Sequence, residues 1–322
     1  MNEKLMSVCD QFISDRDMLQ SVFKWANHYI MPVSALTLRG NSDAEKMKSC
    51  KKIIEKNTGV FSGFSGNAAL PVAVKLASAE VPEEKFAEIL EIYNILKKHF
   101  GNSGYLAYIA TVLADMIPVS EADAIGERGR RIYKLMSKKH PFLTSGEDTP
   151  FAVLFAFSEK EDEELIADME EYYIAMKRLS SNANVLQSIS HILALEVGER
   201  EAKIQRFKDL FALLESRGRK YSKHYELSVL AALSLLPVDM ETAADEIIEV
   251  DTFLSEQEGY GFFGYDKKTR LMHAVMLVMN SYSESAADTA AVTNTLAMVA
   301  AQQAAMCAII AASAGSSAAA TN

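Results

Sequence analysis

The sequence EIYNILKKH at residues 91–99 recurs in altered form as RIYKLMSKKH at residues 131–140 and as EYYIAMKRL at residues 171–179. The tyrosine at the third position of each copy returns every forty residues. Self-similarity at this period is typical of stacked helix pairs, because one pair alone cannot bury its apolar face. The repeat therefore predicts an all-α protein built from tandem helical hairpins of about forty residues.

Each copy lies in a helix with one apolar face, which we call an A helix. Around the first copy, Phe86, Ile89 and Tyr93 follow the spacing of a helical face, and Glu and Lys fill many of the remaining positions. Nearly charge-free segments follow the A helices, and we call these B helices: YLAYIATVLADM from Tyr105, PFAVLFAFS from Pro150, VLQSISHILALE from Val185 and YELSVLAALSLL from Tyr225. A helix that is apolar all round must be enclosed, so we expect the B helices to form an inner layer covered by the A helices.

These hairpins imply one continuous helical-repeat domain, since each hairpin packs only on its neighbours. The domain is expected to span residues 1–322, with an N-terminal hairpin at 1–42, repeated A/B hairpins at 43–281, an alanine-rich capping helix at 282–313 and a disordered tail at 314–322. Ser120 and Ser158, each followed three residues later by an acid, have capping-box spacing ahead of an A helix. No segment alternates in the manner of a strand. The array is predicted to form an α-solenoid or an α/α ring.

The charge balance narrows the range of partners. A net charge of −10 and an isoelectric point near 5.2 oppose binding to nucleic acid or to an anionic bilayer, because both attract clustered positive charge. Cys9, Cys50 and Cys307 lie far apart in the sequence and form no metal-binding pattern. We expect buried or idle thiols in a reducing cytoplasm, and we expect neither a metal nor a cofactor.

Neither end of the sequence predicts an export signal or a membrane span. The first seventeen residues mix acids and bases and contain no apolar core of signal-peptide length. Residues 289–322 carry no charge, but their alanine-rich composition, interrupted by Gln302 and Gln303, is only weakly hydrophobic for a spanning helix. The expected location is therefore the cytoplasm.

Charges along the A helices are ordered, with acids early and bases late. This order complements the helix macrodipole, which contributes about 0.3–1 kcal/mol per exposed charge. Because equivalent helix ends should align in a stacked array, we expect a basic rim opposite an acidic one. The basic rim would comprise Lys97, Lys98, Lys138, Lys139, Lys177 and Arg178. Such a rim could bind an acidic protein segment or a small anionic ligand, although the helix dipole alone accounts for its charges.

Two histidines occupy equivalent positions in B helices. Aligning QSISHILALE with TRLMHAVMLV places His191 and His273 at the same position of helices two repeats apart. Histidine is the commonest general base and metal ligand, but no H-E-x-x-H pattern or acidic cluster accompanies this pair. Two interpretations fit the pattern: a ligand-binding or catalytic role, and a buried core histidine that makes one hydrogen bond.

The loop at residues 259–270 combines glycines with large apolar side chains. Its sequence, GYGFFGYDKKTR, carries Tyr260, Phe262, Phe263, Tyr265 and Arg270. Glycines allow tight backbone turns, and aromatic rings with an arginine would suit an anionic organic ligand. The competing interpretation is a plug whose aromatic rings fill the core.

Several of these motifs together resemble one known family. The motifs are NTGVFSGFSGN at residues 57–67, the three tyrosine copies, KKHPFLTS at 138–145, LQSISHILAL at 186–195, EGYGFFGYDKKTRLM at 258–272 and AQQAAM at 301–306. They are similar to the bacterial family called domain of unknown function 4003, and the resemblance spans nearly the whole chain. It implies a protein with no assigned activity, and therefore no catalytic residues to carry over.

Two functions are compatible with the sequence. The first is a non-enzymatic helical-repeat scaffold that binds a protein partner or a small ligand on its inner surface or basic rim. The alternative is an enzyme or small-molecule carrier with its site inside a closed α/α ring, near His191, His273 and the 259–270 loop. The 57–67 loop has neither the phosphate-loop order nor the G-x-S-x-G pattern, so nucleotide binding and serine hydrolysis are not expected.

Overall fold

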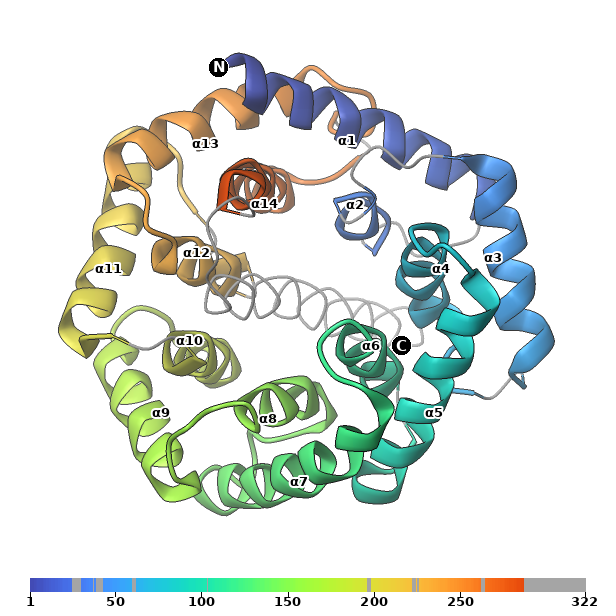
Figure 1. The fold of residues 1–322 in the computed structure, drawn as a ribbon. Coiled ribbons are helices and arrows are strands. Elements are labelled where there is room, and N and C mark those ends of the chain that lie inside the picture. The colour runs from blue at the N-terminus through green and yellow to red at the C-terminus, as the bar shows by residue number, and fades with distance from the viewer. Residues whose placement is uncertain are drawn as a thin grey trace, which may run out of the picture. The chain divides into compact units, whose positions relative to one another are not determined.

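The computed structural model describes residues 1–24, 30–36, 38, 43–59, 62–102, 104–195, 198–221, 224, 226–261 and 264–286. Every regular element in these residues is a helix, and they contain no strand (Figure 1). The predicted all-α fold is thus confirmed. Residues 282–286 of the expected capping helix belong to a helix that begins at Lys267, whereas the rest of it and the expected tail lie outside the described residues.

The chain divides into two compact units. Of the described residues, the N-terminal unit comprises those between 11 and 163, and the C-terminal unit comprises residues 1–10 and those between 164 and 286. Helix α1 (Glu3–Val22) has residues in both units, as does α9 (Asp162–Met176). The N-terminal unit also contains α2 (Ile30–Ala35), α3 (Ala44–Asn57), η1 (Gly66–Ala68), α4 (Ala69–Ala77), α5 (Pro82–Phe100), α6 (Gly104–Leu113), η2 (Val119–Glu121), α7 (Ala122–Lys139), η3 (Gly146–Asp148) and α8 (Thr149–Phe155). The C-terminal unit also contains α10 (Ala183–Leu195), α11 (Arg200–Ser216), α12 (Glu226–Leu235), α13 (Met240–Ser255) and α14 (Lys267–Ala286). The single repeat domain stays a prediction.

In the N-terminal unit, long helices lie outside short ones (Figure 1). Helices α3, α5 and α7 each pack against the short helix that follows, and the short helix α6 packs against both α4 and α8. Every residue of α8 is buried. Because α8 has no charged side chain, its enclosure removes apolar surface from water at a gain of about 25 cal/mol per Å². The predicted inner position of charge-free helices is confirmed in this unit.

The C-terminal unit also pairs successive helices, although its last helix, α14, is as long as 20 residues. Helix α11 packs against α12, α13 packs against α14, and α12 also contacts α10 and α14. The start of the chain belongs here, since Asn2 Nδ2 donates to Glu246 Oε1 of α13 at 3.0 Å. Lys203 of α11 is buried. Its ammonium group tolerates burial because Nζ donates to the backbone oxygen of Leu193 at 2.7 Å and lies 5.0 Å from the Tyr172 ring. The buried ammonium of Lys203 thus has fixed partners within the protein.

Two of the three cysteines fall on described residues. Cys9 and Cys50 are free, buried thiols, as predicted. Burial raises the pKa of Cys9 to about 12, so this thiol stays protonated and unreactive near neutral pH. Cys307 lies outside the described residues.

The starts of α7 and α9 lack the capping boxes that the sequence predicts at Ser120 and Ser158. The chain enters α7 through the 3-10 turn η2, so Ser120 lies inside that turn and no side chain caps the first turn of α7. The hydroxyl of Ser158 accepts from the backbone N–H of Lys160 at 3.2 Å within the turn that precedes α9. Neither serine therefore forms the predicted capping box. The spacing was correct, but each serine lies too far before the helix to reach its free N–H groups.

Two arginines of long helices bind equivalent turns. Arg128 of α7 donates to the backbone oxygens of Ala156, Ser158 and Lys160, at 3.2, 2.6 and 2.5 Å. These acceptors lie 28, 30 and 32 residues further along the chain. Arg206 of α11 donates to the oxygens at the same three offsets, at 2.9, 2.6 and 2.9 Å. These carbonyls lie where the chain leaves α8 and α12. Each guanidinium thus satisfies helix-end groups that have no partner within the helix.

Replacing either arginine by alanine should destabilise the protein. Three carbonyls lose charge-assisted hydrogen bonds in each variant, so we expect Arg128→Ala and Arg206→Ala each to lower the free energy of unfolding by about 2–4 kcal/mol. Urea unfolding followed by circular dichroism measures the change. Arg178→Ala, at an exposed position, is the control and should change stability by less than about 0.5 kcal/mol. An equally small effect at Arg206 would mean that water replaces the guanidinium.

Asp148 makes the stability of the N-terminal unit depend on pH. It ends the turn η3 ahead of α8, where the backbone N–H of Ser145 donates to its carboxylate at 2.7 Å. Asp148 is 5% exposed, and this burial, together with the nearby Glu147, raises its pKa to about 7 despite that hydrogen bond. Because this pKa exceeds the ordinary aspartate pKa of 3.8, the folded chain binds more protons than the unfolded chain between those pH values.

The contribution of Asp148 to the free energy of unfolding should therefore fall as the pH rises from about 4 to about 7, by up to about 1.4 kcal/mol per pH unit. Asp148→Asn keeps an acceptor oxygen for Ser145 but cannot ionise. The stability of this variant relative to the wild type should rise across that interval and then become constant. Urea unfolding at half-unit pH steps measures the difference. A difference that is independent of pH would contradict the raised pKa.

Candidate functional site

The loop between α13 and α14 carries a buried cluster of rings. Tyr260 and Tyr265 are 3% and 5% exposed, and His273 of α14 is completely buried. The hydroxyl of Tyr260 lies 2.8 Å from His273 Nδ1, within hydrogen-bond distance. The two tyrosine rings pack edge-on against the imidazole at centroid distances of 5.8 and 5.1 Å. The described part of this loop is therefore packed as a plug would be, while Phe262 and Phe263 lie outside the described residues.

Arg270 binds a carboxylate apart from these rings. Its Nε and Nη2 donate to the two carboxylate oxygens of Asp251 at 2.7 and 3.3 Å. Arg219 Nε lies 2.9 Å from Asp251 Oδ2, so two guanidinium groups share one carboxylate. Asp251 is 2% exposed, which strengthens these contacts because little water screens them. Much of the charge of Arg270 is thus neutralised inside the protein, which weakens its assignment to an anionic ligand.

The second histidine singled out by the sequence, His191, is also buried. It is 2% exposed and lies in α10, which packs against α12. Within the described ranges, no group of three or more His, Cys, Asp or Glu side chains is arranged to hold a metal ion. Burial of His191 and His273 agrees with the interpretation of core histidines. A ligand-binding role for either stays a prediction.

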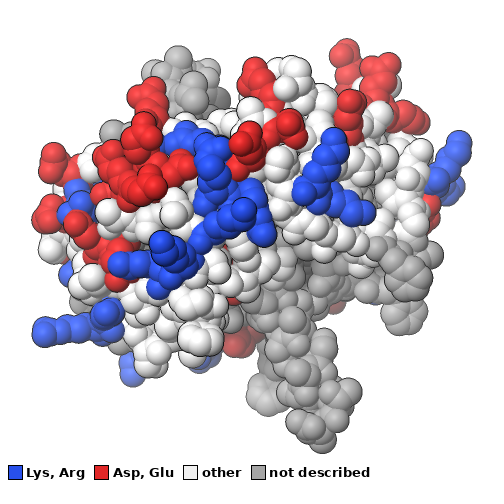
Figure 2. Space-filling view, turned by 90° about the horizontal axis from the view of Figure 1, so that it is seen from below, with Lys and Arg blue, Asp and Glu red and all other residues white. Residues whose placement is uncertain are grey.

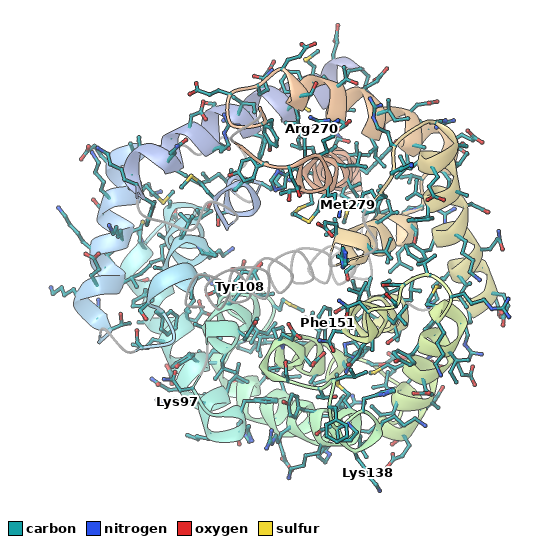
Figure 3. All side chains as sticks on the ribbon, turned by 180° about the vertical axis from the view of Figure 1, so that it is seen from behind. Lys97, Tyr108, Lys138, Phe151, Arg270 and Met279 are labelled. Atoms are coloured by element: carbon teal, nitrogen blue, oxygen red, sulfur yellow. The ribbon has the colours of Figure 1, made fainter. Side chains whose placement is uncertain are left out.

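The lysine pairs of the N-terminal unit lie in the last turns of α5 and α7. His99, in the last turn of α5, lies 3.0 Å from the carboxylate of Asp123, in the first turn of α7. Lys97, two residues before His99, therefore lies toward the start of α7, whereas Lys138 lies in the last turn of α7, about 23 Å further along the helix. Figure 3 shows these two lysines pointing outward at separate places. Their neighbours Lys98 and Lys139 are separated in the same way, and Lys177 and Arg178 are exposed residues of the other unit.

The predicted basic rim stays a prediction in this unit. The basic end of α5 lies against the acidic start of α7, so equivalent ends are not side by side. Figure 2 shows basic and acidic side chains lying next to one another on the face in view. Opposite charges at neighbouring helix ends attract one another. This attraction between helices is separate from the interaction of each charge with the dipole of its own helix.

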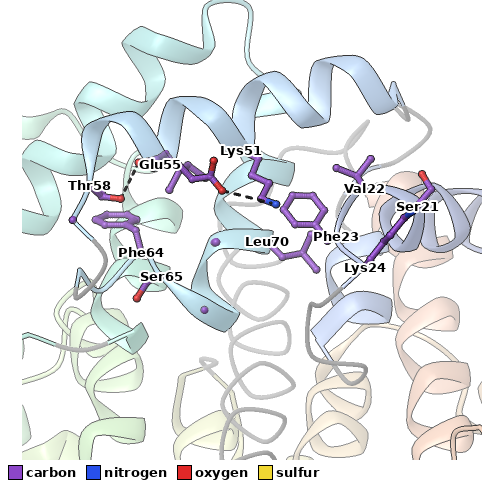
Figure 4. A pocket seen from close by; sticks show the side chains of 14 residues that line it. Ser21, Val22, Phe23, Lys24, Lys51, Glu55, Thr58, Phe64, Ser65 and Leu70 are labelled. Carbon is purple, nitrogen blue, oxygen red and sulfur yellow. Dashed lines mark hydrogen bonds and ion pairs between the residues drawn. The ribbon is translucent and has the colours of Figure 1, made fainter.

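A pocket of about 620 Å³ is formed by described residues of the N-terminal unit (Figure 4). It lies between the end of α1, the second half of α3, and the 57–67 loop that leads through η1 into α4. Its apolar lining consists of Val22, Phe23, Ile54, Phe64, Ala69 and Leu70. Its polar lining consists of Ser21, Lys24, Lys51, Glu55, Thr58 and Ser65.

The apolar wall of this pocket is positioned by the neighbouring helices. The ring of Phe64 packs edge-on against Phe86 and Tyr93 of α5, at centroid distances of 5.5 and 4.8 Å. Gly66 has a φ of +62°, a conformation that side-chain-bearing residues rarely adopt, and this turns the loop into η1 and α4. Leu70 of α4 is 1% exposed. The wall is therefore preformed by packing and needs no ligand to order it.

Comparison with known proteins identifies the family of this chain. Residues 17–304 match the model of a family described as protein of unknown function (DUF4003). The chain belongs to the DUF4003 family. A relative from Bacillus subtilis (strain 168), named uncharacterized protein YeaA, is 23% identical over 287 residues, which cover 85% of this chain and 84% of the relative. No solved structure matches this DUF4003 chain.

The sequence of this DUF4003 protein draws attention to the 57–67 loop, which forms one wall of the pocket, but it does not predict the pocket itself. The 57–67 loop contributes Phe64 and Ser65 to the lining, and its mixture of glycines and aromatic rings is the available signal. Phe23 and Lys51 carry no such signal, because a pocket shared by three separate elements leaves no local pattern. Among the described residues, no helix of this DUF4003 protein has both the length and the apolar character needed to cross a membrane.

Proposed function

We propose that this DUF4003 protein is a non-enzymatic binding protein whose ligand is a small, largely apolar molecule held in the pocket between α1, α3 and α4. The pocket itself carries the proposal. Its volume of about 620 Å³ lies within the range of about 300–1,000 Å³ that is typical of small-molecule sites. Apolar walls with a few polar groups are likewise typical of such sites.

The preformed walls also support ligand binding. Phe64 is fixed against α5, and Ile54 and Leu70 are buried on the pocket side of α3 and α4. Because these side chains are already ordered, a ligand loses little affinity to rearrangement of the protein. Binding of a partner at the basic rim receives less support, since the lysine pairs of the N-terminal unit lie apart.

Filling the pocket with a side chain tests the proposal. Decanol, a neutral apolar probe at about ten times its Kd, should raise the midpoint of thermal unfolding of the wild type by about 2–4 °C. Ala69→Phe places a ring in the pocket and should remove this rise. Ser65→Phe, at an exposed position of the lining, is a second filling variant in case the first does not fold.

The control variant is Ala124→Phe, which adds the same ring at an exposed position of α7 in the same unit. It should retain the full response to decanol. No response of the wild type, or an equal response in the folded filling variants, would overturn the proposal.

A further inference from the structure

The pocket carries an excess of positive charge in a chain whose net charge is −10. Lys24 and Lys51 line it, against one acid, Glu55. Helix α3, which forms one wall, contains five lysines and two glutamates. The local field at the pocket therefore favours an anion, although the molecule as a whole is acidic.

Lys51 is placed to bind a ligand. Its Nζ lies 3.8 Å from Glu55 Oε1, which is longer than a hydrogen bond, and the side chains are 42% and 61% exposed, so this ion pair is weak. The Phe23 ring lies 5.5 Å from the same Nζ and orients the ammonium at the pocket by a cation–π contact (Figure 4). The N–H donors of Lys51 thus remain available for a carboxylate or phosphate oxygen.

The hydroxyl groups of the lining cannot take the place of this lysine. Ser21, Thr58 and Ser65 each donate their hydrogen to a backbone oxygen three or four residues earlier, at 2.7, 2.8 and 2.8 Å. A hydroxyl has a single hydrogen, so these oxygens can only accept from a ligand. Among the side chains of the lining, an anionic group therefore finds its hydrogen-bond donors at the lysines.

We infer that the ligand is an anionic amphiphile, with a carboxylate or phosphate group bound by Lys51 and an apolar body packed against Phe23, Phe64 and Leu70. This inference rests on the proposed function, because it requires the pocket to be a ligand site. Lys24 adds a second positive charge to the lining. The apolar walls contribute affinity through burial, and the ammonium selects for the charge of the ligand.

Four probes with one common tail test the charge preference. Decanoate, decyl phosphate, decanol and decyltrimethylammonium are titrated into the full chain by isothermal titration calorimetry, below their micelle-forming concentrations. The two anions should bind about tenfold tighter than decanol, and the cation should bind most weakly. The comparison of decanoate with decyl phosphate shows which anionic group the pocket prefers.

Variants of α3 identify the residue responsible. Lys51→Ala should weaken decanoate binding about tenfold and leave decanol binding unchanged. Lys52→Ala is the matched control, because the neighbouring lysine is exposed and does not line the pocket. Glu55→Gln removes the competing carboxylate and should strengthen decanoate binding about twofold to fivefold, an effect that a purely structural role of Glu55 would not produce.

The outcomes separate this inference from the proposed function. Equal affinity for all four probes, lost in Ala69→Phe, would leave the pocket as a ligand site but overturn the anionic ligand. Tightest binding of decyltrimethylammonium, or an unchanged decanoate affinity in Lys51→Ala, would overturn it as well. If none of the probes binds, both the inference and the proposed function fail.

Discussion

Replacing Gly264 by alanine is expected to lower the free energy of unfolding by about 3 kcal/mol or more. A Cβ atom at this position would lie 1.8 Å from the backbone oxygen of Gly259 and 2.4 Å from its carbonyl carbon. Both are backbone atoms, so no side chain can rotate away and the loop itself must move. The loop is closed at the same place by the hydrogen bond from the backbone N–H of Tyr265 to Gly259, at 2.8 Å.

Movement of this loop would reach the core of the C-terminal unit. Tyr260 and Tyr265 pack against the completely buried His273, so a displaced backbone would move both tyrosine rings away from the imidazole. Urea unfolding and the near-ultraviolet circular dichroism of the tyrosines measure the loss of stability and of packing. Gly261→Ala is the matched control, because nothing lies within 4 Å of its Cβ, and it should change stability by less than about 0.5 kcal/mol. Equal tolerance of the two substitutions would contradict this geometry.

The second large effect is expected at Asp251. Asp251→Asn keeps the size of the side chain but removes the charge that Arg219 and Arg270 share, at 2.9 and 2.7 Å. The side chain of Arg270 is only 15% exposed, so its guanidinium would be left in a poorly hydrated place without a counter-charge. Breaking a buried pair in this way costs about 3–5 kcal/mol. We expect a loss of that size, dominated by Arg270, in urea unfolding at neutral pH.

Asp245→Asn provides the comparison on the same helix. Its carboxylate lies 3.0 Å from Arg217, but it is 66% exposed, so this surface pair should contribute less than about 1 kcal/mol. If Asp251→Asn were as mild as Asp245→Asn, water would have to reach Arg270 in the variant. The buried carboxylate would then be a minor contributor to stability.

The helices of this protein are predictable from its sequence because their signals are local. The charge-free run at α8 can be stable only when enclosed, and every one of its residues is buried. The apolar face of α5 is set by spacing, and the three positions named for it, Phe86, Ile89 and Tyr93, are all buried. Helix starts were less predictable, since Ser120 has capping-box spacing but lies within a 3-10 turn.

The candidate sites were predictable to different degrees. Tyr260, Tyr265 and His273 lie within one short stretch, so their meeting could be anticipated. The pairing of Arg270 with Asp251 could not, because the two residues lie 19 positions apart on different helices and no sequence pattern links them. The contact between His99 at the end of α5 and Asp123 at the start of α7 was likewise absent from the pattern.

By itself, the sequence determined that this chain is helical, which of its segments are enclosed, and where its charges lie along each helix, because all three depend on neighbours a few residues apart. Only the tertiary structure decided that Phe23, Lys51 and Phe64, from three elements, line one pocket of about 620 Å³. It also decided that two arginines share one carboxylate. The physical reason is that distances across helices depend on how side-chain volumes pack, and no spacing along the chain records that packing.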